Sequence, residues 1–324
     1  MTPRPTVVVT RRLPSEVEEE LNRDFDARLN RDDRPLGPGG LQDALRSADA
    51  MLCTVTDRLT AEVLSAEPLR ARVLANFGVG YNHIDISAAK ARGLAISNTP
   101  DVLTEATADI ALTLLLMVSR RAGEGERHVR CGAWTGWRPT HMLGTQVSGK
   151  TLGLIGMGRI ARAVARRAHS GFGMRILFHD PYPPSAPEAA ALGAEARQTP
   201  EQVLEEADFV SLHCPATPET HHLMNRERLA RMRRSAFLIN TARGDIVDEA
   251  ALVDALADGT IAGAGLDVYE HEPQVTPELL TMENVVLFPH LGSATQETRV
   301  AMGRRAVENL RLFFSGAPLR DPVV

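Results

Sequence analysis

The sequence predicts an α/β protein of two domains, each built on a parallel sheet with helices on both faces. Along its 324 residues, short apolar runs alternate with segments of helical periodicity, both before and after residue 100. Such alternation is typical of βαβ units. In the run LGLIGMGRIA, at 152–161, an apolar strand leads through a glycine turn into a helix. Together these features predict two Rossmann-like, doubly wound domains, with the second inserted into the first.

The composition excludes several classes of protein. The chain is 44% hydrophobic and 24% charged, as in globular domains, and its net charge of −5 comes without a concentrated basic patch that would favour nucleic acid. No apolar run is long enough to span a membrane, and the N-terminal residues lack the apolar core of a signal peptide, so we expect a cytoplasmic protein. Cys53, Cys131 and Cys214 are far apart, which predicts reduced thiols and no metal site.

The first domain is predicted from residues 1–99 and the C-terminal residues 292–324. Apolar runs indicate strands at 6–10, 50–54, 73–77 and 94–97, and helical periodicity indicates helices at 14–25, 41–48, 60–66 and 83–92. A polar loop rich in Pro and Gly lies at 32–40, and Asn98-Thr99-Pro100 ends the pattern. A last helix at about 295–314 is expected to return the chain to this domain.

A long apolar segment at 105–130 carries Ala, Leu, Ile and Met at helical spacing. Its apolar content exceeds what a one-sided surface helix needs. We therefore expect it to pack into the interface of a homodimer as well as on its own domain. The next residues, 131–150, contain Trp134 and Trp137 and are typical of a loop. The roles of these tryptophans and of His141 stay open.

The glycine turn at 156–161 has the G-x-G-x-x-A spacing of a dinucleotide-binding site. Gly156 permits a tight turn, Gly158 lets a pyrophosphate approach the backbone, and Ala161 lets the helix pack against the strand. The N-terminus of the helix offers N–H groups to the phosphates. The predicted site is completed by the other residues of the turn: Met157, Arg159 and Ile160.

Asp180 follows a second apolar run, about twenty residues after the glycines, where an acid is expected to meet the adenosine ribose. Its other interpretation is a turn residue before Pro181. A carboxylate accepts hydrogen bonds from ribose hydroxyls but repels a 2′-phosphate, and no Arg directly follows His179-Asp180-Pro181. The sequence therefore predicts NAD as the cofactor, with NADH preferred over NADPH.

The domain at 100–291 continues with strands at 209–213, 236–241, 263–268 and 285–288, and helices at 226–232 and 249–258. Three loops follow strands, at the edge where ligands of open α/β sheets bind. The first contains Arg243, which can hold a carboxylate bidentately or be an ordinary surface Arg. The second contains Asp267, Glu270 and Glu272. The third contains His290, which is either catalytic or structural.

At these residues the chain resembles a known family. The runs NFGVGYNHID (76–85), NTPDVLTEATAD (98–109), NTARGDIVDE (240–249), GLDVYEHEP (265–273) and FPHLGSAT (288–295) are similar to signatures of the D-isomer-specific 2-hydroxyacid dehydrogenases. Within that family, GAWTGWRP (132–139) and SGKTLGLIGMGRIA (148–161) are most similar to the glyoxylate/hydroxypyruvate reductases. The resemblance covers essentially the whole chain.

The resemblance implies an active site in the cleft between the two domains. Arg243 would hold the substrate carboxylate and polarise its carbonyl group. His290 would donate a proton to the carbonyl oxygen as a hydride arrives from the nicotinamide, and Glu272 would keep His290 protonated. The backbone N–H groups of Val79 and Gly80 would bind the carboxylate from the other domain.

Two details of this assignment depend on neighbouring residues. Glu270 competes with Glu272, but the family pattern places the acid directly before Pro, and the formate-dehydrogenase branch has Gln there. Cys214 is a nucleophile or, more simply, a wall of the cofactor site. Beyond the glycine turn and Asp180, the resemblance implies these cofactor residues: Thr107, His179, Pro181, Cys214, Thr241, Ala242, Arg243, Asp267, His290 and Gly292.

The function that these features predict is NADH-dependent reduction of a small 2-oxo acid, glyoxylate or hydroxypyruvate, to the D-2-hydroxy acid. One alternative is a D-3-phosphoglycerate dehydrogenase, which is expected less because the chain ends soon after its last helix. The other is a nucleotide-sensing binding protein like the corepressors that share this scaffold. The expected partners are the small acid and a second copy of the chain, with no nucleic acid and no membrane.

Overall fold

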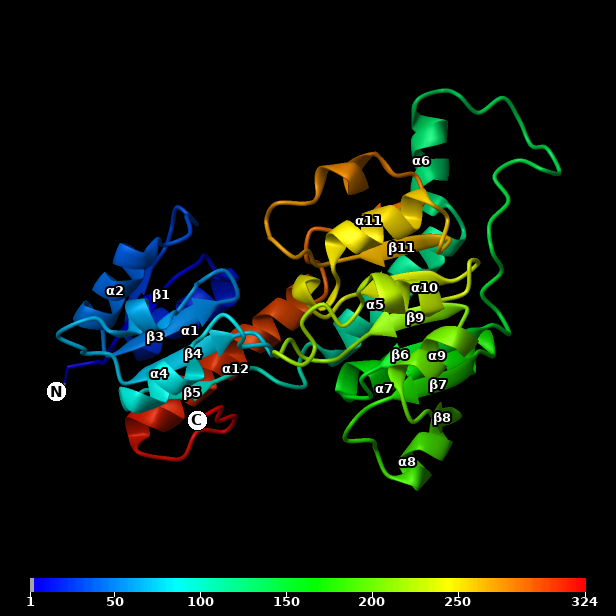
Figure 1. Ribbon diagram of the computed structural model, residues 1–324. Coiled ribbons are helices and arrows are strands. Elements are labelled where there is room, and N and C mark those ends of the chain that lie inside the picture. The colour runs from blue at the N-terminus through cyan, green and yellow to red at the C-terminus, as the bar shows by residue number, and fades with distance from the viewer. Residues whose placement is uncertain (1–2) are drawn as a thin grey trace. The chain divides into compact units, whose positions relative to one another are not determined.

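The computed structural model describes residues 3–324, which divide into two compact units (Figure 1). One unit contains the described residues up to Leu103 together with Ala294–Val324, and the other is Thr104–Ser293. The boundaries predicted from the sequence are 99/100 and 291/292. Each unit is built on a sheet of parallel strands, so the predicted fold class, with one unit inserted into the other, is confirmed.

The sheet of the first unit has five strands in the order β2-β1-β3-β4-β5. They are β1 (Thr6–Val9), β2 (Asp26–Leu29), β3 (Ala50–Thr54), β4 (Val73–Phe77) and β5 (Ala95–Ser97). The apolar runs of β3 and β4 lie in the centre and are buried. Strand β2 is not predicted from the sequence, because its residues DARL form no apolar run and its side chains are exposed or half-buried at the sheet edge.

Five helices cover this sheet, among them the C-terminal helix that returns the chain to the unit. They are α1 (Ser15–Asp24), α2 (Pro38–Ser47), α3 (Ala61–Leu64), α4 (Ile86–Ala91) and α12 (Gln296–Ser315). Helix α12 packs on β4 and on α1. At the contact with α1, a Cβ on Gly303 would lie 2.4 Å from a methyl carbon of Val17. Only glycine therefore lets these two helices approach so closely.

The sheet of the second unit has seven strands in the order β12-β11-β10-β9-β6-β7-β8. They are β6 (Thr151–Ile155), β7 (Arg175–His179), β8 (Ala194–Ala196), β9 (Phe209–Leu212), β10 (Phe237–Asn240), β11 (Gly263–Leu266) and β12 (Val285–Leu287). The chain leaves β6 on one side for β7 and later returns to its other side with β9. Such a reversal of strand order is where ligands of doubly wound sheets bind, and it places the glycine turn after β6 at that point.

The helices of the second unit differ from the prediction in two places. They are α5 (Thr104–Ser119), α6 (Ala122–Arg130), α7 (Arg159–Phe172), α8 (Ala186–Ala191), α9 (Pro200–Glu206), α10 (Arg226–Arg231) and α11 (Glu249–Ala257). The segment at 105–130 is two helices rather than one, because Arg121 has a left-handed backbone with φ of 53°. The short elements α8, β8 and α9 are also not predicted from the sequence.

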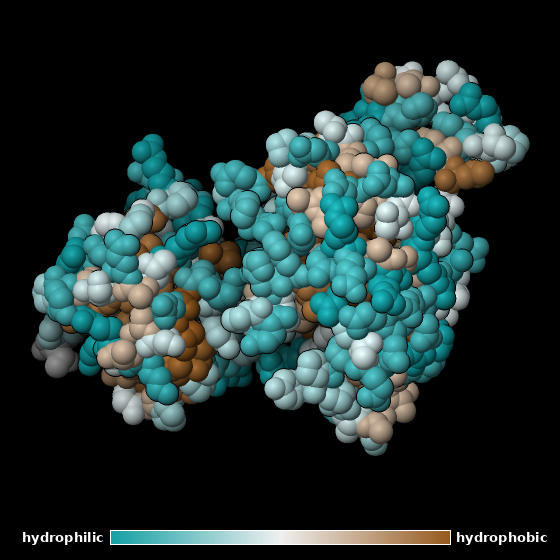
Figure 2. All heavy atoms as spheres, viewed as in Figure 1, coloured by the Kyte–Doolittle hydropathy of each residue, from teal (hydrophilic) through white to brown (hydrophobic). Residues whose placement is uncertain are grey.

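Helices α5 and α6 have different surroundings. Helix α5 is largely buried and packs on α7 and β11 within its own unit. Helix α6 has no buried residue and extends away from the sheet of its unit, with the segment after it (Figure 1). In the same part of the molecule, hydrophobic side chains lie among hydrophilic ones (Figure 2). No helix among residues 3–324 is long and apolar enough to cross a membrane.

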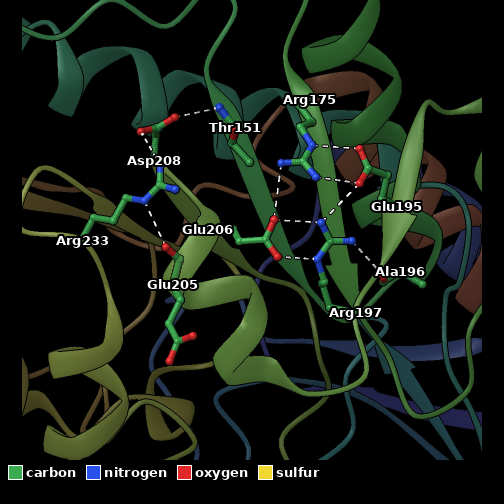
Figure 3. A network of polar contacts seen from close by, with 9 residues as sticks. All are labelled: Thr151, Arg175, Glu195, Ala196, Arg197, Glu205, Glu206, Asp208 and Arg233. Atoms are coloured by element: carbon green, nitrogen blue, oxygen red, sulfur yellow. Dashed lines mark hydrogen bonds and ion pairs between the residues drawn. The ribbon is translucent and has the colours of Figure 1, made fainter.

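Four charged side chains join β7, β8 and α9 at one edge of the second sheet (Figure 3). Arg175 binds Glu195 through two hydrogen bonds of 2.8 and 2.7 Å. Arg197 binds Glu206 through two of 2.6 and 2.8 Å, and cross-contacts of 3.2 to 3.4 Å link the two pairs. The hydrogen bonds from Arg175 lower the pKa of Glu195 to about 2, against a smaller effect of burial. The network therefore stabilises the fold at pH above 4.5, and loses that effect as the pH falls towards 2.

We expect Glu206→Gln to lower the free energy of unfolding by about 0.5–1 kcal/mol, since exposed ion pairs contribute little singly and more in networks. The loss should shrink at 1 M salt, where charges are screened within about 3 Å. Urea denaturation at low and high salt measures both effects. The neighbouring Glu205→Gln removes a single exposed pair with Arg231 and should cost less. Equal losses for the two variants would contradict the network.

Candidate active site

The turn from β6 to α7 requires glycine at its first position. Gly156 has φ of +89°, and a Cβ there would lie 2.7 Å from the backbone nitrogen of Cys214. A Cβ on Gly158, by contrast, would meet no atom within 4 Å. Gly156 therefore allows the strand ends to approach, and Gly158 leaves open space beside the backbone. This is the difference expected of the two glycines in a dinucleotide fingerprint.

The helix after this turn fits the phosphates of a dinucleotide. Helix α7 begins at Arg159, so Arg159 and Ile160 form its first turn, and it runs for 14 residues. Ala161 is fully buried against the sheet, which lets the helix lie close to β6. The N-terminus of a helix carries N–H groups and a partial positive charge that stabilise phosphate. The turn, the open space at Gly158 and the helix N-terminus thus suit a nicotinamide dinucleotide.

Asp180 lies beside the glycine turn, at the end of β7. One carboxylate oxygen accepts a hydrogen bond of 2.6 Å from the N–H of Met157, and the other accepts one of 2.7 Å from the N–H of Tyr182. His179 places its Nδ1 3.1 Å from the carbonyl oxygen of Arg197, and Pro181 is exposed. Asp180 therefore holds two backbone segments. Each oxygen has a further lone pair, with which it can accept a ribose hydroxyl.

His290 and Glu272 form a pair, with 2.9 Å between Nδ1 of His290 and Oε2 of Glu272. The other oxygen of Glu272 accepts a hydrogen bond of 3.1 Å from the N–H of Tyr269. Burial raises the pKa of Glu272, but the hydrogen bond and charge of His290, the N–H of Tyr269 and the charge of Arg243 outweigh it. The pKa of Glu272 therefore lies below its ordinary 4.5, and the carboxylate is ionised at neutral pH.

The side chain of Glu270 contacts a different histidine, His222. Its Oε1 is 2.8 Å from Nε2 of His222, and its backbone N–H donates to Glu249 at 2.7 Å. The structure therefore places Glu272, and not Glu270, against His290. His221, His222 and Glu270 have ligand atoms within 4.8 Å of one another, the spacing a metal ion would need. His222 and Glu270 already use each other as hydrogen-bond partners.

The turn that carries His290 is held by two buried side chains. Asp267 accepts hydrogen bonds of 2.6 and 2.8 Å from the N–H groups of Leu291 and Gly292. Thr107 donates its hydroxyl to the carbonyl oxygen of Gly292 at 3.0 Å. Burial raises the pKa of Asp267, although these N–H groups and His290 oppose the rise. Thr107 and Asp267, predicted as cofactor residues, thus fix the turn in which His290 has a φ of 56°.

The loop of Arg243 is shaped by the last residue of β10. Asn240 donates its amide to the carbonyl oxygen of Arg243 at 2.8 Å and accepts the N–H of Ala242 at 3.0 Å. The guanidinium of Arg243 donates to the carbonyl oxygen of Ala242 at 2.6 Å. Burial lowers the pKa of Arg243, and the charges of Glu272 and Asp245 oppose this. Since a guanidinium stays charged in proteins, Arg243 is a fixed positive group beside the His290–Glu272 pair.

Several residues of this site were not predicted from the sequence. Asn240 shapes the Arg243 loop, and a Cβ on Gly244 would overlap the backbone of Tyr269 at 1.8 Å. His213, which is half-buried, places Nε2 2.9 Å from the hydroxyl of Ser211, and burial lowers its pKa to about 4. Asn240 and Gly244 flank Arg243 in the run NTARG, and this position beside Arg243 is the feature of the sequence that could have identified them. Nothing in the sequence marks His213.

Cys214 and Thr241 lie at the ends of neighbouring strands in this unit. Burial raises the pKa of the Cys214 thiol to about 12. A thiol with so high a pKa is not a nucleophile at neutral pH, which favours its role as a wall of the site. The buried hydroxyl oxygen of Thr241 has no hydrogen-bond partner among residues 3–324.

Val79 and Gly80 belong to the first unit, in the loop that follows β4. Both are half-buried. A cavity of about 500 Å³ opens at the carboxyl ends of the strands of this sheet, and its lining includes Thr54, Thr56 and Phe77. Strands β3 and β4 both end at this edge, so the loop of Val79 and Gly80 lies where ligands of parallel sheets bind.

The chain matches the model of "D-isomer specific 2-hydroxyacid dehydrogenase, NAD binding domain" over residues 112–292. It is 47% identical over 316 residues to the glyoxylate reductase of Korarchaeum cryptofilum, covering 97% of this chain and 94% of that one. The glyoxylate reductase of Thermococcus kodakarensis is 46% identical over 318 residues, with the same coverage. Among solved structures, the NADPH-dependent glyoxylate/hydroxypyruvate reductase of Sinorhizobium meliloti, in complex with NADP and malonate, matches with a TM-score of 0.88. It is 38% identical, covering 99% of this chain and 97% of that one.

The family model covers more than half of the chain, and these relatives match nearly its whole length. The resemblance read from the motifs is therefore confirmed, and so is the prediction of an enzyme with a nicotinamide cofactor. The chain belongs to the D-isomer-specific 2-hydroxyacid dehydrogenases and is an oxidoreductase that acts on CH–OH groups.

Proposed function

We propose that the protein reduces glyoxylate and hydroxypyruvate to the corresponding 2-hydroxy acids, with NADH as the preferred cofactor. The observation that carries this proposal is the His290–Glu272 pair at 2.9 Å, beside the charged Arg243. An acid paired with histidine and an arginine for the carboxylate are the groups that such a reduction needs. The names of the relatives from Korarchaeum and Thermococcus support the choice of substrate.

Each residue of the site has one task in this proposal. When bound, the reduced nicotinamide supplies a hydride to the carbonyl carbon. His290 uses Nδ1 to contact Glu272, so its Nε2 is the nitrogen that donates a proton to the carbonyl oxygen. Glu272, which is ionised, stabilises the positive charge of the imidazolium. Arg243 binds the substrate carboxylate, which also accepts the backbone N–H groups of Val79 and Gly80.

We propose the cofactor contacts from the motifs and from the same geometry. Gly156, Gly158 and the first turn of α7 bind the pyrophosphate, and Asp180 binds the adenosine ribose. Thr107 and Asp267 act through the turn at 290–292. The remaining proposed contacts are Met157, Arg159, Ile160, His179, Pro181, Cys214, Thr241, Ala242, Arg243, His290 and Gly292.

A substrate panel tests the function. Glyoxylate, hydroxypyruvate, pyruvate and 3-phosphohydroxypyruvate are each offered with NADH and with NADPH, and cofactor oxidation is followed by absorbance. We expect the highest kcat/KM with glyoxylate or hydroxypyruvate and NADH. A preference for 3-phosphohydroxypyruvate would make the protein a phosphoglycerate dehydrogenase instead. No turnover on any acid, with tight NADH binding, would indicate a nucleotide-sensing protein.

We also propose a homodimer, but its interface is assigned to α6 and the residues after it rather than to the whole segment 105–130. The apolar residues of α5 are largely buried in their own unit. Exposed hydrophobic side chains lie instead on α6 and in the residues after it, among them Trp134, which is 53% exposed, and Trp137, which is 81% exposed. Large exposed apolar groups gathered on one projecting segment mark an interaction surface. Symmetric pairing of two chains is the commonest way to cover such a surface.

Sedimentation velocity at micromolar concentration is expected to give twice the chain's mass of 35.2 kDa. Trp137→Asp should shift the protein towards the monomer, because it places a charge on the proposed interface. Tyr182→Asp is the matched control, since Tyr182 is 91% exposed on another loop, and it should leave the dimer intact. A wild-type monomer at these concentrations would refute the dimer.

A further inference from the structure

Asn76 has an unusual position for a polar side chain. It lies in the interior strand β4, is fully buried, and its amide oxygen has no hydrogen-bond partner among residues 3–324. Its amide nitrogen donates two hydrogen bonds, 3.1 Å to the carbonyl oxygen of Gly78 and 3.0 Å to that of Gly80. A buried polar group without a full set of partners costs stability. The gain from Asn76 must therefore lie in the shape of the loop that it binds.

Every carbonyl group of the loop from Gly78 to Gly80 is held by a donor of the same unit. Gly78 also accepts the N–H of Thr99 at 3.0 Å, and Val79 accepts the side-chain amide of Asn98 at 2.9 Å. No acceptor among the described residues takes the N–H of Val79 or of Gly80. The carbonyl oxygens are thus all fixed, while these two N–H groups remain available to a ligand.

The geometry of the peptide bond links these two facts. A trans peptide unit is planar, with its C=O and the following N–H pointing in opposite directions. The hydrogen bonds from Asn76 and Thr99 to the carbonyl of Gly78 therefore set the direction of the N–H of Val79. The bond from Asn98 to Val79 does the same for the N–H of Gly80.

We propose that Asn76 is a positioning residue, which aims the N–H of Val79 at the carboxylate of the substrate. The inference rests on the proposed function, in which that loop binds the carboxylate. Asn suits the position because one amide nitrogen supplies two donors from within the sheet. Aspartate has the same shape as asparagine but no hydrogen-bond donor when ionised, and alanine has no polar group at all.

Asn76→Ala tests the proposal with glyoxylate as substrate and oxamate as the carboxylate inhibitor. A hydrogen bond to a charged group is lost while the catalytic groups stay in place, so the KM should rise at least tenfold and kcat should change less than about threefold. The Ki of oxamate should rise in parallel with the KM. The Kd of NADH, measured by fluorescence, should not change.

Two further variants separate positioning from stability. Ser97→Ala removes from the adjacent strand β5 a buried hydroxyl that has no hydrogen-bond partner among residues 3–324, and it should leave the KM and the Ki unchanged. Asn76→Ser keeps one donor in a smaller side chain, should give an intermediate KM, and replaces Asn76→Ala if that variant does not fold. All assays are run well below each variant's Tm.

An unchanged KM and Ki in a folded Asn76 variant would overturn the inference. So would a rise in KM that is matched by an equal fall in kcat and an equal rise in the Kd of NADH. Binding of oxamate to the NADH complex, measured by calorimetry, distinguishes this failure from that of the proposed function. If the wild type binds oxamate without reducing glyoxylate, the function is wrong, and weaker oxamate binding by Asn76→Ala still supports the inference. If the wild type neither binds nor turns over, both are wrong.

Discussion

Replacing His290 with alanine is expected to lower kcat for glyoxylate reduction by about two to four orders of magnitude, the usual contribution of a positioned general acid. The Kd of NADH should change little, because the glycine turn and Asp180 are separate from the imidazole ring. Steady-state rates and fluorescence titration with NADH measure the two quantities. Near-normal turnover by the variant would remove His290 from the proposed mechanism.

Two glutamate variants give this prediction a matched control. Glu272→Gln removes the charge 2.9 Å from Nδ1 of His290, and it should lower kcat about tenfold or more because the imidazolium loses its ionised partner. Glu270→Gln alters a similar acid two residues away, but one that contacts His222 at 2.8 Å. It should leave kcat nearly unchanged. The reverse order of effects would mean that Glu270 supports the acid during turnover.

The fold and the main groups of the site could be predicted because they depend on short stretches of sequence. The apolar runs of β3, β4 and β6 and the turn at Gly156 and Gly158 each carry their pattern within about ten residues. The edge strand β2 has no such pattern, since its side chains are not buried. The break at Arg121 was hidden for another reason, because Arg is an ordinary residue for a helix interior.

The supports of the site could not be predicted, because each acts across a long stretch of chain. Asp267 holds Gly292 and Thr107 holds the same residue from 185 positions away. The resemblance implies that both residues bind the cofactor, and the structure adds that their side chains contact the turn that carries His290. Asn76 and Asn240 look like ordinary strand residues until their amides are seen on the carbonyl oxygens of neighbouring loops. The motifs therefore identify residues of the site but do not predict which groups their side chains contact.

The wild-type enzyme is expected to use NADH more efficiently than NADPH, by about ten- to a hundredfold in kcat/KM. The carboxylate of Asp180 repels a 2′-phosphate, whereas it accepts hydrogen bonds from the ribose hydroxyls of NADH. A hydrogen bond to a charged group contributes about 1.5–3 kcal/mol, which corresponds to about one to two powers of ten in kcat/KM. Arg159, in the first turn of α7, offers a positive charge that reduces this difference. The relative from Sinorhizobium is NADPH-dependent, so the scaffold itself does not decide the preference.

Asp180→Ala should narrow the ratio of kcat/KM for NADH to that for NADPH, chiefly by lowering the KM of NADPH. It also removes the acceptor of the N–H groups of Met157 and Tyr182. Asp180→Asn separates these two effects, because it keeps the shape and one acceptor while removing the charge. If charge repulsion sets the preference, both variants narrow the ratio, and Asn does so with the smaller loss of NADH efficiency. Arg159→Gln should widen the ratio of kcat/KM for NADH to that for NADPH, since the first turn of α7 then no longer offers a positive charge to the 2′-phosphate. Equal use of NADH and NADPH by the wild type, unchanged in Asp180→Ala, would show that Asp180 does not meet the ribose and serves only to hold the glycine turn.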